Sequence, residues 1–348
     1  MLKNSYDTVI IGAGPAGLSC AMQLKRLGAS DLLVAERCEF PRDKCCAGYI
    51  TNKTKKAFED FGLDVGGCGY TLIDDFRLIY KNREKQKIKN RFLYTGPRIN
   101  RVELDDAFFR LAVNNGISVA EKTAVISHDA DAHTVTFSGG VTVSYKHIVF
   151  ADGTLGFGSR YQDRRRRNIA MQLIFPTNRE NGINIIFGAS PKGYGWQSTY
   201  NGLCNIGLTD YYDKNRDYRA LFEGYMKSLG IETDVSGLYA AFTPASVGKP
   251  VIGDVYFVGD ALGACDPLTL SGLRYGVGSG KAAAQAIAAS DPKILYRYAA
   301  AMRFKFAISS ALMRVFYLRP VQFLVFNVGC TVLRPFVTFA FNRFLCRK

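Results

Sequence analysis

The segment TVIIGAGPAG, residues 8–17, constrains the fold of this chain more than any other stretch. Its first four residues are β-branched, which is typical of a short buried strand. The glycine-rich turn after them leads into LSCAMQLKRLG, where apolar residues recur at helical spacing. A strand, a glycine turn and a helix in this order predict the first βα unit of a doubly wound α/β sheet.

The glycines of this turn have separate roles in such a unit. Gly12 permits the tight turn, Gly14 lets a pyrophosphate approach backbone N–H groups, and Gly17 lets the helix pack on the strand. The next predicted strand, DLLVAER, ends near Glu36, whose carboxylate can accept hydrogen bonds from both hydroxyls of an adenosine ribose. Because that carboxylate would repel a 2′-phosphate, the expected ligand is FAD or NAD.

A second glycine-rich segment, residues 255–287, favours FAD. It contains a short strand ending at Gly259-Asp260, a glycine-rich loop and an alanine-rich helix. This order resembles the second FAD motif of the glutathione-reductase-like flavoproteins. The resemblance implies that Asp260 binds the ribityl chain, and that Gly272 and Leu273 offer backbone N–H groups to the flavin ring. A helix N-terminus there would stabilise the negative charge of the reduced ring.

Residues 99–119, INRVELDDAFFRLAVNNGISV, lie between these two motifs. They resemble the Arg-x-x-x-Asp helix start of para-hydroxybenzoate-hydroxylase-like enzymes. The resemblance implies that Arg101 reaches the cofactor from the helix N-terminus with Asp105 behind it, and that Val125 packs on the adenine. Taken alone, Arg101 would be read as a solvated surface arginine.

The segment FPRDKCCAGYI, residues 40–50, places two adjacent cysteines after a basic run. It looks like the FPRxKxCGG segment of the geranylgeranyl reductase family of FAD enzymes and of their halogenase relatives. The matching cysteine is Cys46, not Cys45, and Ala47 replaces the first glycine. Together with the motifs above, the resemblance implies a cofactor site of Gly12, Gly14, Ala16, Gly17, Glu36, Arg37, Cys46, Ala47, Gly48, Arg101, Val125, Asp260, Gly272 and Leu273.

Cys46 is also the candidate catalytic residue. A thiol with an ordinary pKa of about 8.5 is mostly protonated at neutral pH and can donate a proton to a substrate. The alternative is a small residue that packs under the flavin ring. The sequence identifies no acid or base partner for Cys46, so both interpretations stay open.

The segment GYGWQSTYNG, residues 193–202, supplies the candidate substrate site. Tyr194 and Trp196 resemble the first half of the Tyr-x-Trp-x-Phe-Pro segment that faces the substrate in the same reductases, whereas Ser198 and Thr199 replace the Phe-Pro half. Residues two apart on a strand share a face, so we expect both aromatic rings to contact the substrate. Trp196 is the only tryptophan of the chain, and a buried core aromatic is its alternative role.

The order of these motifs predicts an α/β protein with an α+β second domain. Alternating patterns such as IAMQLIF and GINIIFG predict an antiparallel β-sheet that covers the flavin. The expected parts are a Rossmann-like FAD-binding domain of residues 1–75, 98–160 and 245–290, a substrate domain of residues 76–97 and 161–244, and a basic helical tail of residues 291–348. Within the substrate domain, the run DRRRRN at residues 163–168 is expected to be a solvated turn.

The tail after Asp291 has ten Lys or Arg and no acidic residue. Only fourteen uncharged residues lie between Arg319 and Arg334, fewer than the roughly 20 that span a bilayer. Leu295, Met302, Phe306 and Met313 share one helical face. The segment 295–348 is therefore expected to lie peripherally on anionic lipid. A helical cap over the substrate domain is the alternative.

The composition narrows the cellular setting. Nine cysteines without a CxxC pair and only three histidines disfavour a metal site and a disulfide framework. The N-terminal sequence has no secretory signal pattern, so we expect a cytoplasmic protein on the inner face of the cell membrane. The net charge of +15 attracts an anionic partner, for which lipid is favoured over nucleic acid.

The function expected from the resemblance is an FAD-dependent reductase. It would saturate carbon–carbon double bonds of an isoprenoid or other lipid-like substrate by hydride transfer from reduced flavin. The alternatives are a flavin monooxygenase, acting as a hydroxylase or epoxidase on an apolar substrate, and a flavoprotein that docks a redox partner or nucleic acid. The electron donor stays open among NAD(P)H, ferredoxin and a quinol.

Overall fold

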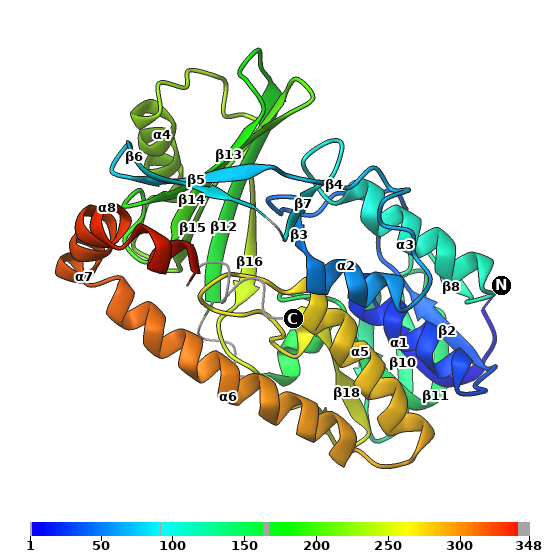
Figure 1. The fold of residues 1–348 in the computed structure, drawn as a ribbon. Helices are drawn as coiled ribbons and strands as arrows, with labels where there is room; N and C mark the ends of the chain where they lie inside the picture. Colours follow the sequence, from blue (N-terminus) through cyan, green and yellow to red (C-terminus); the bar gives the residue numbers. More distant parts are fainter. Residues whose placement is uncertain (1, 91, 163–166, 340–348) are drawn as a thin grey trace.

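The computed structural model describes residues 2–90, 92–162 and 167–339, which form two large sheets and the helices around them (Figure 1). The first sheet has the strand order β17-β18-β11-β1-β2-β8, and every neighbouring pair from β18 to β8 is parallel. Its strands are β1 (Ser5–Ile11), β2 (Leu32–Ala35), β8 (Val119–Ala120), β11 (Thr142–Phe150), β17 (Val251–Ile252) and β18 (Val255–Phe257). Strands β9 (Val125–Asp129) and β10 (Thr134–Phe137) extend β11 as an antiparallel pair. This arrangement confirms the predicted Rossmann-like fold.

Strand β1 is apolar on both faces because both faces are covered by other parts of the protein. Val9 and Ile11 pack against the β9–β10–β11 side of the sheet, whereas Ile10 points to the side covered by helices. All three side chains are buried. A parallel strand with both faces covered therefore needs a continuous apolar run rather than an alternating one.

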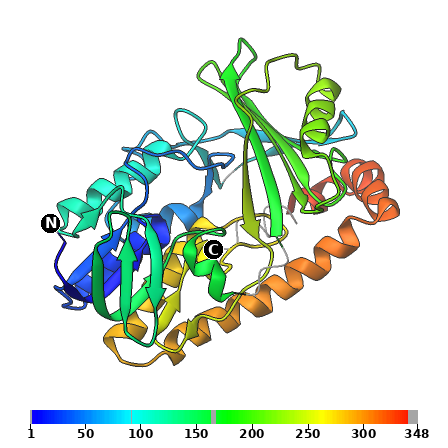
Figure 2. The same ribbon diagram turned by 180° about the vertical axis from the view of Figure 1, so that it is seen from behind.

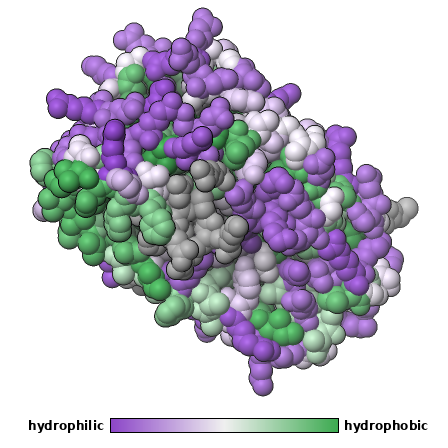
Figure 3. Space-filling view, viewed as in Figure 1, coloured by the Kyte–Doolittle hydropathy of each residue, from purple (hydrophilic) through white to green (hydrophobic). Residues whose placement is uncertain are grey.

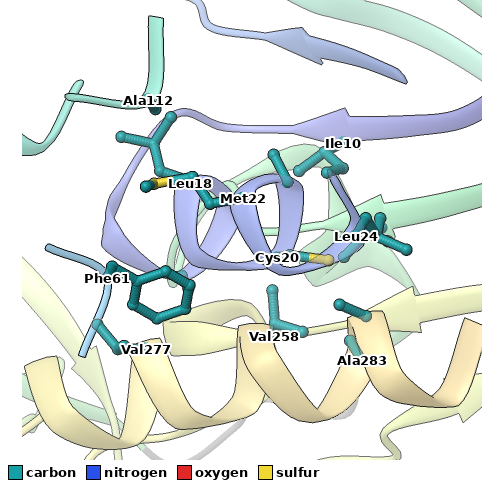
Figure 4. Close-up of a cluster of buried hydrophobic side chains, with 14 of the residues drawn as sticks. Ile10, Leu18, Cys20, Met22, Leu24, Phe61, Ala112, Val258, Val277 and Ala283 are labelled. Carbon is teal, nitrogen blue, oxygen red and sulfur yellow. The ribbon is translucent and has the colours of Figure 1, made fainter. Parts of the chain in front are cut away.

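Helices α1 (Pro15–Arg26) and α5 (Leu273–Ala288) pack directly on each other (Figure 4). Cys20 of α1 lies beside Val258 and Ala283 in their shared core. The approach is close because Gly280 has no side chain: a Cβ built there would lie 2.1 Å from the carbonyl oxygen of Ala16. Helix α3 (Val102–Asn114) completes the layer on this face of the sheet.

The second sheet has the strand order β16-β12-β15-β14-β13-β5-β6. Its strands are β5 (Asp75–Tyr80), β6 (Arg83–Lys89), β12 (Arg167–Pro176), β13 (Gly182–Phe187), β14 (Tyr194–Tyr200), β15 (Leu203–Tyr211) and β16 (Tyr239–Pro244). The prediction of an antiparallel sheet is wrong at one pair, because β5 and β13 run parallel. These two strands are far apart in sequence and no hairpin joins them, so no turn dictates that they run in opposite directions.

Helix α4 (Tyr218–Ser228) covers the outer face of this sheet, with Phe222 and Met226 buried against β12 and β15. The inner face carries Tyr194, Trp196 and Asn205, because residues paired directly across β14 and β15 point to the same side. A small sheet of β3 (Tyr49–Thr51), β7 (Leu93–Thr95) and β4 (Thr71–Leu72), with α2 (Asn52–Glu59) after β3, is separate from the two large sheets. The predicted boundaries between the FAD-binding domain, the substrate domain and the tail stay predictions.

The C-terminal segment contacts both parts of the molecule (Figure 2). Helix α6 (Lys293–Phe316) buries Leu295, Ala299, Met302 and Phe306 against the first sheet and its helices. It is followed by α7 (Arg319–Leu324), a π-helical turn (Val325–Gly329) and α8 (Cys330–Val332). Among the described residues no single helix is suited to cross a membrane, although α6 and the segment Arg319–Val332, bent by 83°, have the length and composition together.

The end of the described tail packs on the second sheet. Phe326, Cys330 and Val337 join a buried cluster with strands β5, β6 and β13. Two polar contacts reinforce this packing: Lys85 Nζ donates to Asn327 Oδ1 at 2.7 Å, and Gln86 Nε2 donates to Thr338 Oγ1 at 2.7 Å. The tail therefore caps one end of the sheet, as the alternative interpretation anticipated. Residues 340–348 of the predicted tail and 163–166 of the predicted basic turn lie outside the described residues.

We expect Gly280→Ala to destabilise the protein, because the added methyl group overlaps the backbone of α1; overpacking of this kind costs about 1–3 kcal/mol. Gly224→Ala in α4 is the matched control. No described neighbour lies within 4 Å of a Cβ built at Gly224. There the change should stabilise the helix by about 0.5–1 kcal/mol. Urea unfolding followed by circular dichroism measures both, and equal midpoints for the two variants would contradict the close α1–α5 contact.

Candidate active site

The start of α1 forms the first part of the site. Gly12 has a φ of 104°, and a Cβ there would lie 2.7 Å from the carbonyl oxygen of Ala151, so the turn requires glycine. Gly17 is equally constrained, because its Cβ would lie 1.9 Å from the oxygen of Gly12. Glu36 is buried beside this turn, where its carboxylate accepts hydrogen bonds from the N–H groups of Ala13 at 2.8 Å and Cys38 at 3.0 Å.

The loop of residues 40–48 passes over that helix start. The ring of Phe40 stacks on Phe109 of α3, with 4.2 Å between ring centroids. Arg42 Nη2 lies 3.4 Å from the position that a Cβ on Gly14 would take, and Arg42 Nη1 lies 3.5 Å from Asp105 Oδ2. Lys44 Nζ forms an ion pair with Asp260 Oδ2 at 2.9 Å. Sequence analysis assigned neither basic residue, although both belong to the FPRxK motif.

Arg101 and Asp105 form a buried ion pair behind this loop. Arg101 Nη2 donates to both carboxylate oxygens of Asp105, at 2.7 and 2.8 Å. Burial opposes the charge of the guanidinium, but the neighbouring Asp105 carboxylate raises the pKa of Arg101 above its ordinary value, and the group stays charged. The structure thus places Asp105 against Arg101, as the resemblance implied. Contact of Arg101 with a cofactor stays a prediction.

The start of α5 forms the opposite side of the site. Gly272 is its N-cap residue, and a Cβ there would lie 3.5 Å from Asp260 Oδ1. Within the described part of the chain, no side chain caps the N-terminus of α1 or of α5. Free N–H groups at two helix N-termini, with Arg42 and Lys44 beside them, fit a ligand that carries a pyrophosphate. The residues present therefore suit FAD.

The remaining predicted cofactor residues lie around this region. Arg37 is exposed directly after Glu36. Val125 begins β9, two residues after Thr123, whose N–H donates to the carbonyl of Glu36 at 2.7 Å. Ala16 lies against Gly259, where a Cβ would lie 2.7 Å from the Ala16 methyl group. Their contacts with a cofactor stay predictions.

The two adjacent cysteines have different surroundings. The Cys45 thiol lies 3.6 Å from the carbonyl oxygen of Ala170, and burial, with a smaller contribution from Cys46, raises the pKa of Cys45 to about 12. The peptide of Cys46 is instead held by side chains of the second sheet: its N–H donates to Gln172 Oε1 at 2.6 Å, and its carbonyl accepts from Asn205 Nδ2 at 3.3 Å. The eight described cysteines are all free thiols.

Gly48 and Ala47 complete the loop. Gly48 has a φ of 77°, and a Cβ there would lie 2.5 Å from the carbonyl carbon of Ile99. Ala47 is half-buried between Cys46 and this glycine. The loop therefore approaches the backbone of the Arg101 segment closely, which only glycine allows at position 48.

Both predicted substrate residues form hydrogen bonds with other residues of the protein. The hydroxyl of Tyr194 donates to the carbonyl oxygen of Thr269 at 3.0 Å, and burial raises the pKa of Tyr194 above its ordinary value. Trp196 is only 4% exposed, and its indole N–H donates to Asn205 Oδ1 at 2.8 Å. The apolar surface of both rings lies on the inner face of the sheet, so their contact with a substrate stays a prediction.

Three polar residues near Cys46 were missed in the sequence. Gln172 and Asn205 are buried on the inner face and bond to its peptide. Tyr49 has a hydroxyl that is enclosed and has no hydrogen-bond partner among the described residues, and burial raises its pKa well above the ordinary value. Gln172 and Asn205 could have been found in the sequence, because each is a polar residue within an apolar strand pattern.

A small pocket opens at one end of this face. It lies between β14 and β15, the loop 267–270 and the end of α6. Tyr194, Leu268, Met313 and Tyr317 are among its lining residues. The C-terminal helix therefore contributes side chains next to the predicted substrate site.

Comparisons with known proteins agree with this geometry. Residues 6–162 match the family described as pyridine nucleotide-disulphide oxidoreductase. The chain is 27% identical to a menaquinone reductase of Mycobacterium tuberculosis, with 83% of this chain and 78% of that protein covered. It is 25% identical to a digeranylgeranylglycerophospholipid reductase of Methanocaldococcus jannaschii, with 83% and 80% covered.

Solved structures share the whole architecture. A geranylgeranyl bacteriochlorophyll reductase-like protein from Thermoplasma acidophilum has a TM-score of 0.78 at 18% identity, covering 97% of this chain and 96% of the other. A flavin-dependent brominase has a TM-score of 0.74 at 22% identity, covering 96% and 92%. At these identities the likeness concerns the fold, while the family match and the two uncapped helix starts indicate the cofactor. The chain is an FAD-dependent oxidoreductase that is similar to the menaquinone and digeranylgeranylglycerophospholipid reductases.

Proposed function

We propose that this protein reduces carbon–carbon double bonds of an isoprenoid or other lipid-like molecule. The observation that carries the proposal is the course of the loop 40–48. Its Lys44 contacts Asp260 in the cofactor region, and two residues later the peptide of Cys46 is bonded to the inner face of the second sheet. One short segment thus connects the cofactor site with the predicted substrate face.

The inner face suits an apolar substrate. Ile185 pairs directly with Trp196 across β13 and β14, and Phe187 pairs with Tyr194, so aliphatic and aromatic groups share one surface. The names of the relatives, reductases of menaquinone and of a digeranylgeranyl phospholipid, support a substrate with a long apolar part. An enclosed apolar surface with few polar groups is typical of such binding sites.

The chain's own residues would bind the cofactor, position the substrate and hold the proton. Bound reduced FAD supplies a hydride. Arg42, Lys44 and the N-termini of α1 and α5 hold the cofactor. Burial raises the pKa of Tyr49 and of Tyr194, so both hydroxyls keep their protons, and Cys46 belongs to the loop that carries Lys44. These groups provide the proton for the second alkene carbon.

Anaerobic reoxidation tests this function. We expect the purified protein, reduced with dithionite, to recover its oxidised flavin absorbance when a geranylgeranyl lipid is added without oxygen, with a product two hydrogen atoms heavier. Mass spectrometry of the extracted lipid identifies that product. A flavin that stays reduced with every prenylated compound would refute the reductase function.

The alternative activity, oxygenation or halogenation of an apolar substrate, is favoured only by the fold shared with the flavin-dependent brominase. It would appear as oxygen consumption stimulated by the substrate and as no anaerobic product. The electron donor is NAD(P)H, ferredoxin or a quinol. Each candidate is mixed separately with the oxidised protein, and stopped-flow absorbance shows which of them reduces the flavin.

Cys46→Ala should bind FAD normally but lower kcat by about 100-fold, as expected for loss of a proton donor. Cys45→Ala is the matched control, because the Cys45 thiol contacts a backbone carbonyl of β12 and its pKa of about 12 makes it unreactive. Its turnover should be unchanged. Equal turnover of both variants with the wild type would mean that Cys46 serves only packing.

We also propose that the tail lies on the cytoplasmic surface of an anionic membrane. Helix α6 has two apolar faces: Phe304, Ile308, Leu312 and Val315 are 40–73% exposed on the side opposite its buried residues. The exposed apolar area continues over α7 and α8, where Figure 3 shows it as a green cluster. No acidic residue follows Asp291, so the charge of this surface complements anionic headgroups.

A double variant, Phe304→Glu with Ile308→Glu, should weaken binding to vesicles containing phosphatidylglycerol by about tenfold or more, since it removes two exposed apolar side chains that would enter the lipid and adds negative charge that the anionic headgroups repel. The control, Ile126→Glu with Leu155→Glu, changes residues that are 55% and 59% exposed outside the tail and should bind as the wild type does. Co-sedimentation measures both. Self-association through this face without lipid, seen by analytical ultracentrifugation, would contradict membrane contact.

A further inference from the structure

Asn205 lies at the centre of a buried set of hydrogen bonds between the second sheet and the cofactor region. Its side chain is fully buried on β15. Asn205 Nδ2 donates to the carbonyl oxygen of Ile99 at 2.6 Å and to that of Cys46 at 3.3 Å, while Oδ1 accepts from Trp196 Nε1 at 2.8 Å. We call Asn205 and these three partners the Asn205 bridge.

Trp196 determines the orientation of the Asn205 amide. An indole N–H can only donate, so the amide atom facing it must be the oxygen, and the amide nitrogen must face the two carbonyls. The indole itself has little freedom. A Cβ on Gly207 would lie 1.9 Å from Trp196 Cζ2, so the ring lies across a position that only glycine leaves open. The hydroxyl of Tyr225 also bonds to the Trp196 carbonyl at 3.1 Å.

Gln172 holds the other end of the Cys46 peptide. It is 3% exposed on β12, and its Oε1 accepts from the Cys46 N–H at 2.6 Å. In the register of the sheet, Gln172 is opposite Gly207 and Asn205 is opposite Ile174, so the two amides are diagonal neighbours on one face. An acceptor and a donor thus bond to the two ends of a single residue.

Ile99 adds a second reason for the bridge. It is a β-branched residue with a φ of 51°, a conformation that costs energy and persists only where the surroundings enforce it. Its carbonyl accepts the shortest hydrogen bond of the bridge, and its backbone contacts Gly48 closely. Ile99 lies two residues before Arg101, so the same amide supports both the Cys46 loop and the start of α3.

We propose that Asn205 is a positioning residue that acts through Cys46. By bonding the carbonyls of Cys46 and Ile99, it keeps the cysteine at the junction of the cofactor region and the substrate face. Trp196 acts indirectly, by orienting the Asn205 amide. The consequence for catalysis rests on the proposed function, whereas the effect on the loop does not.

Asn205→Asp is the sharpest variant, because it keeps the shape but replaces the NH2 donor with an acceptor facing two carbonyls. Trp196→Phe removes the indole N–H together with part of the ring, introduces no charge, and serves as a second variant if the aspartate variant does not fold. Ser198→Ala is the matched control: Ser198 pairs directly with Asn205 across the strands, and its hydroxyl has no partner among the described residues.

Alkylation of Cys46 by iodoacetamide in the FAD-loaded protein, followed by peptide mass spectrometry, measures the mobility of the loop. We expect the rate constant to rise about tenfold or more in Asn205→Asp, and by less in Trp196→Phe, since each leaves buried groups poorly paired. Ser198→Ala should match the wild type. The emission of the single tryptophan should shift to longer wavelength in Asn205→Asp.

The same variants separate this inference from the proposed function. Alkylation rates equal to the wild type in both Asn205→Asp and Trp196→Phe would overturn the inference even if the protein reduces alkenes. Faster alkylation with no alkene reduction by the wild type would support the bridge and refute the function. If both hold, kcat should fall in Asn205→Asp while the flavin absorbance spectrum shifts, and KM for the electron donor should not change.

Discussion

The convergence of two helix N-termini is the interaction on which the rest of the site depends. Strands β1, β11 and β18 are parallel neighbours, so their carboxyl ends lie at one edge of the sheet. Helices α1 and α5, which follow β1 and β18 in the chain, therefore begin close together and direct free N–H groups at the same region. Gly280 permits this closeness, because a side chain there would overlap backbone atoms of α1.

The loop 40–48 turns this anion-binding edge into a candidate active site. Arg42 and Lys44 add positive charge beside the helix starts. Each is paired with a carboxylate, which offsets the repulsion between the two cations and the positive ends of the helices. After Lys44 the chain leaves the region of the first sheet, and the side-chain amides of Gln172 and Asn205 in the second sheet form hydrogen bonds with its backbone. The two parts of the molecule are thus joined through backbone groups of Cys46 and Ile99, and the geometry of the site depends on their buried partners.

The tail shows that the two expectations for it are compatible. Phe326 and Val337 are buried against the second sheet, which makes the segment a cap. The opposite side leaves large apolar groups such as Phe304 and Phe323 exposed, far more than an isolated solvent-facing helix needs. A cap whose outer surface is apolar and basic lies next to the pocket formed with Met313 and Tyr317.

The sequence by itself determined the first sheet, the cofactor and the motif residues at the helix starts. Such features depend on local chemistry: Gly12 needs a positive φ, and β1 needs apolar residues on both faces. The assignment of Cys46 rather than Cys45 to the site stays a prediction. Only the tertiary structure decided the parallel pairing of β5 with β13, the capping by the tail, and the partners of Trp196. These arise between segments far apart in the chain, where no spacing rule applies. Asn205 is the clearest case, since a polar residue in an apolar strand has no readable partner until folding brings Trp196, Ile99 and Cys46 around it.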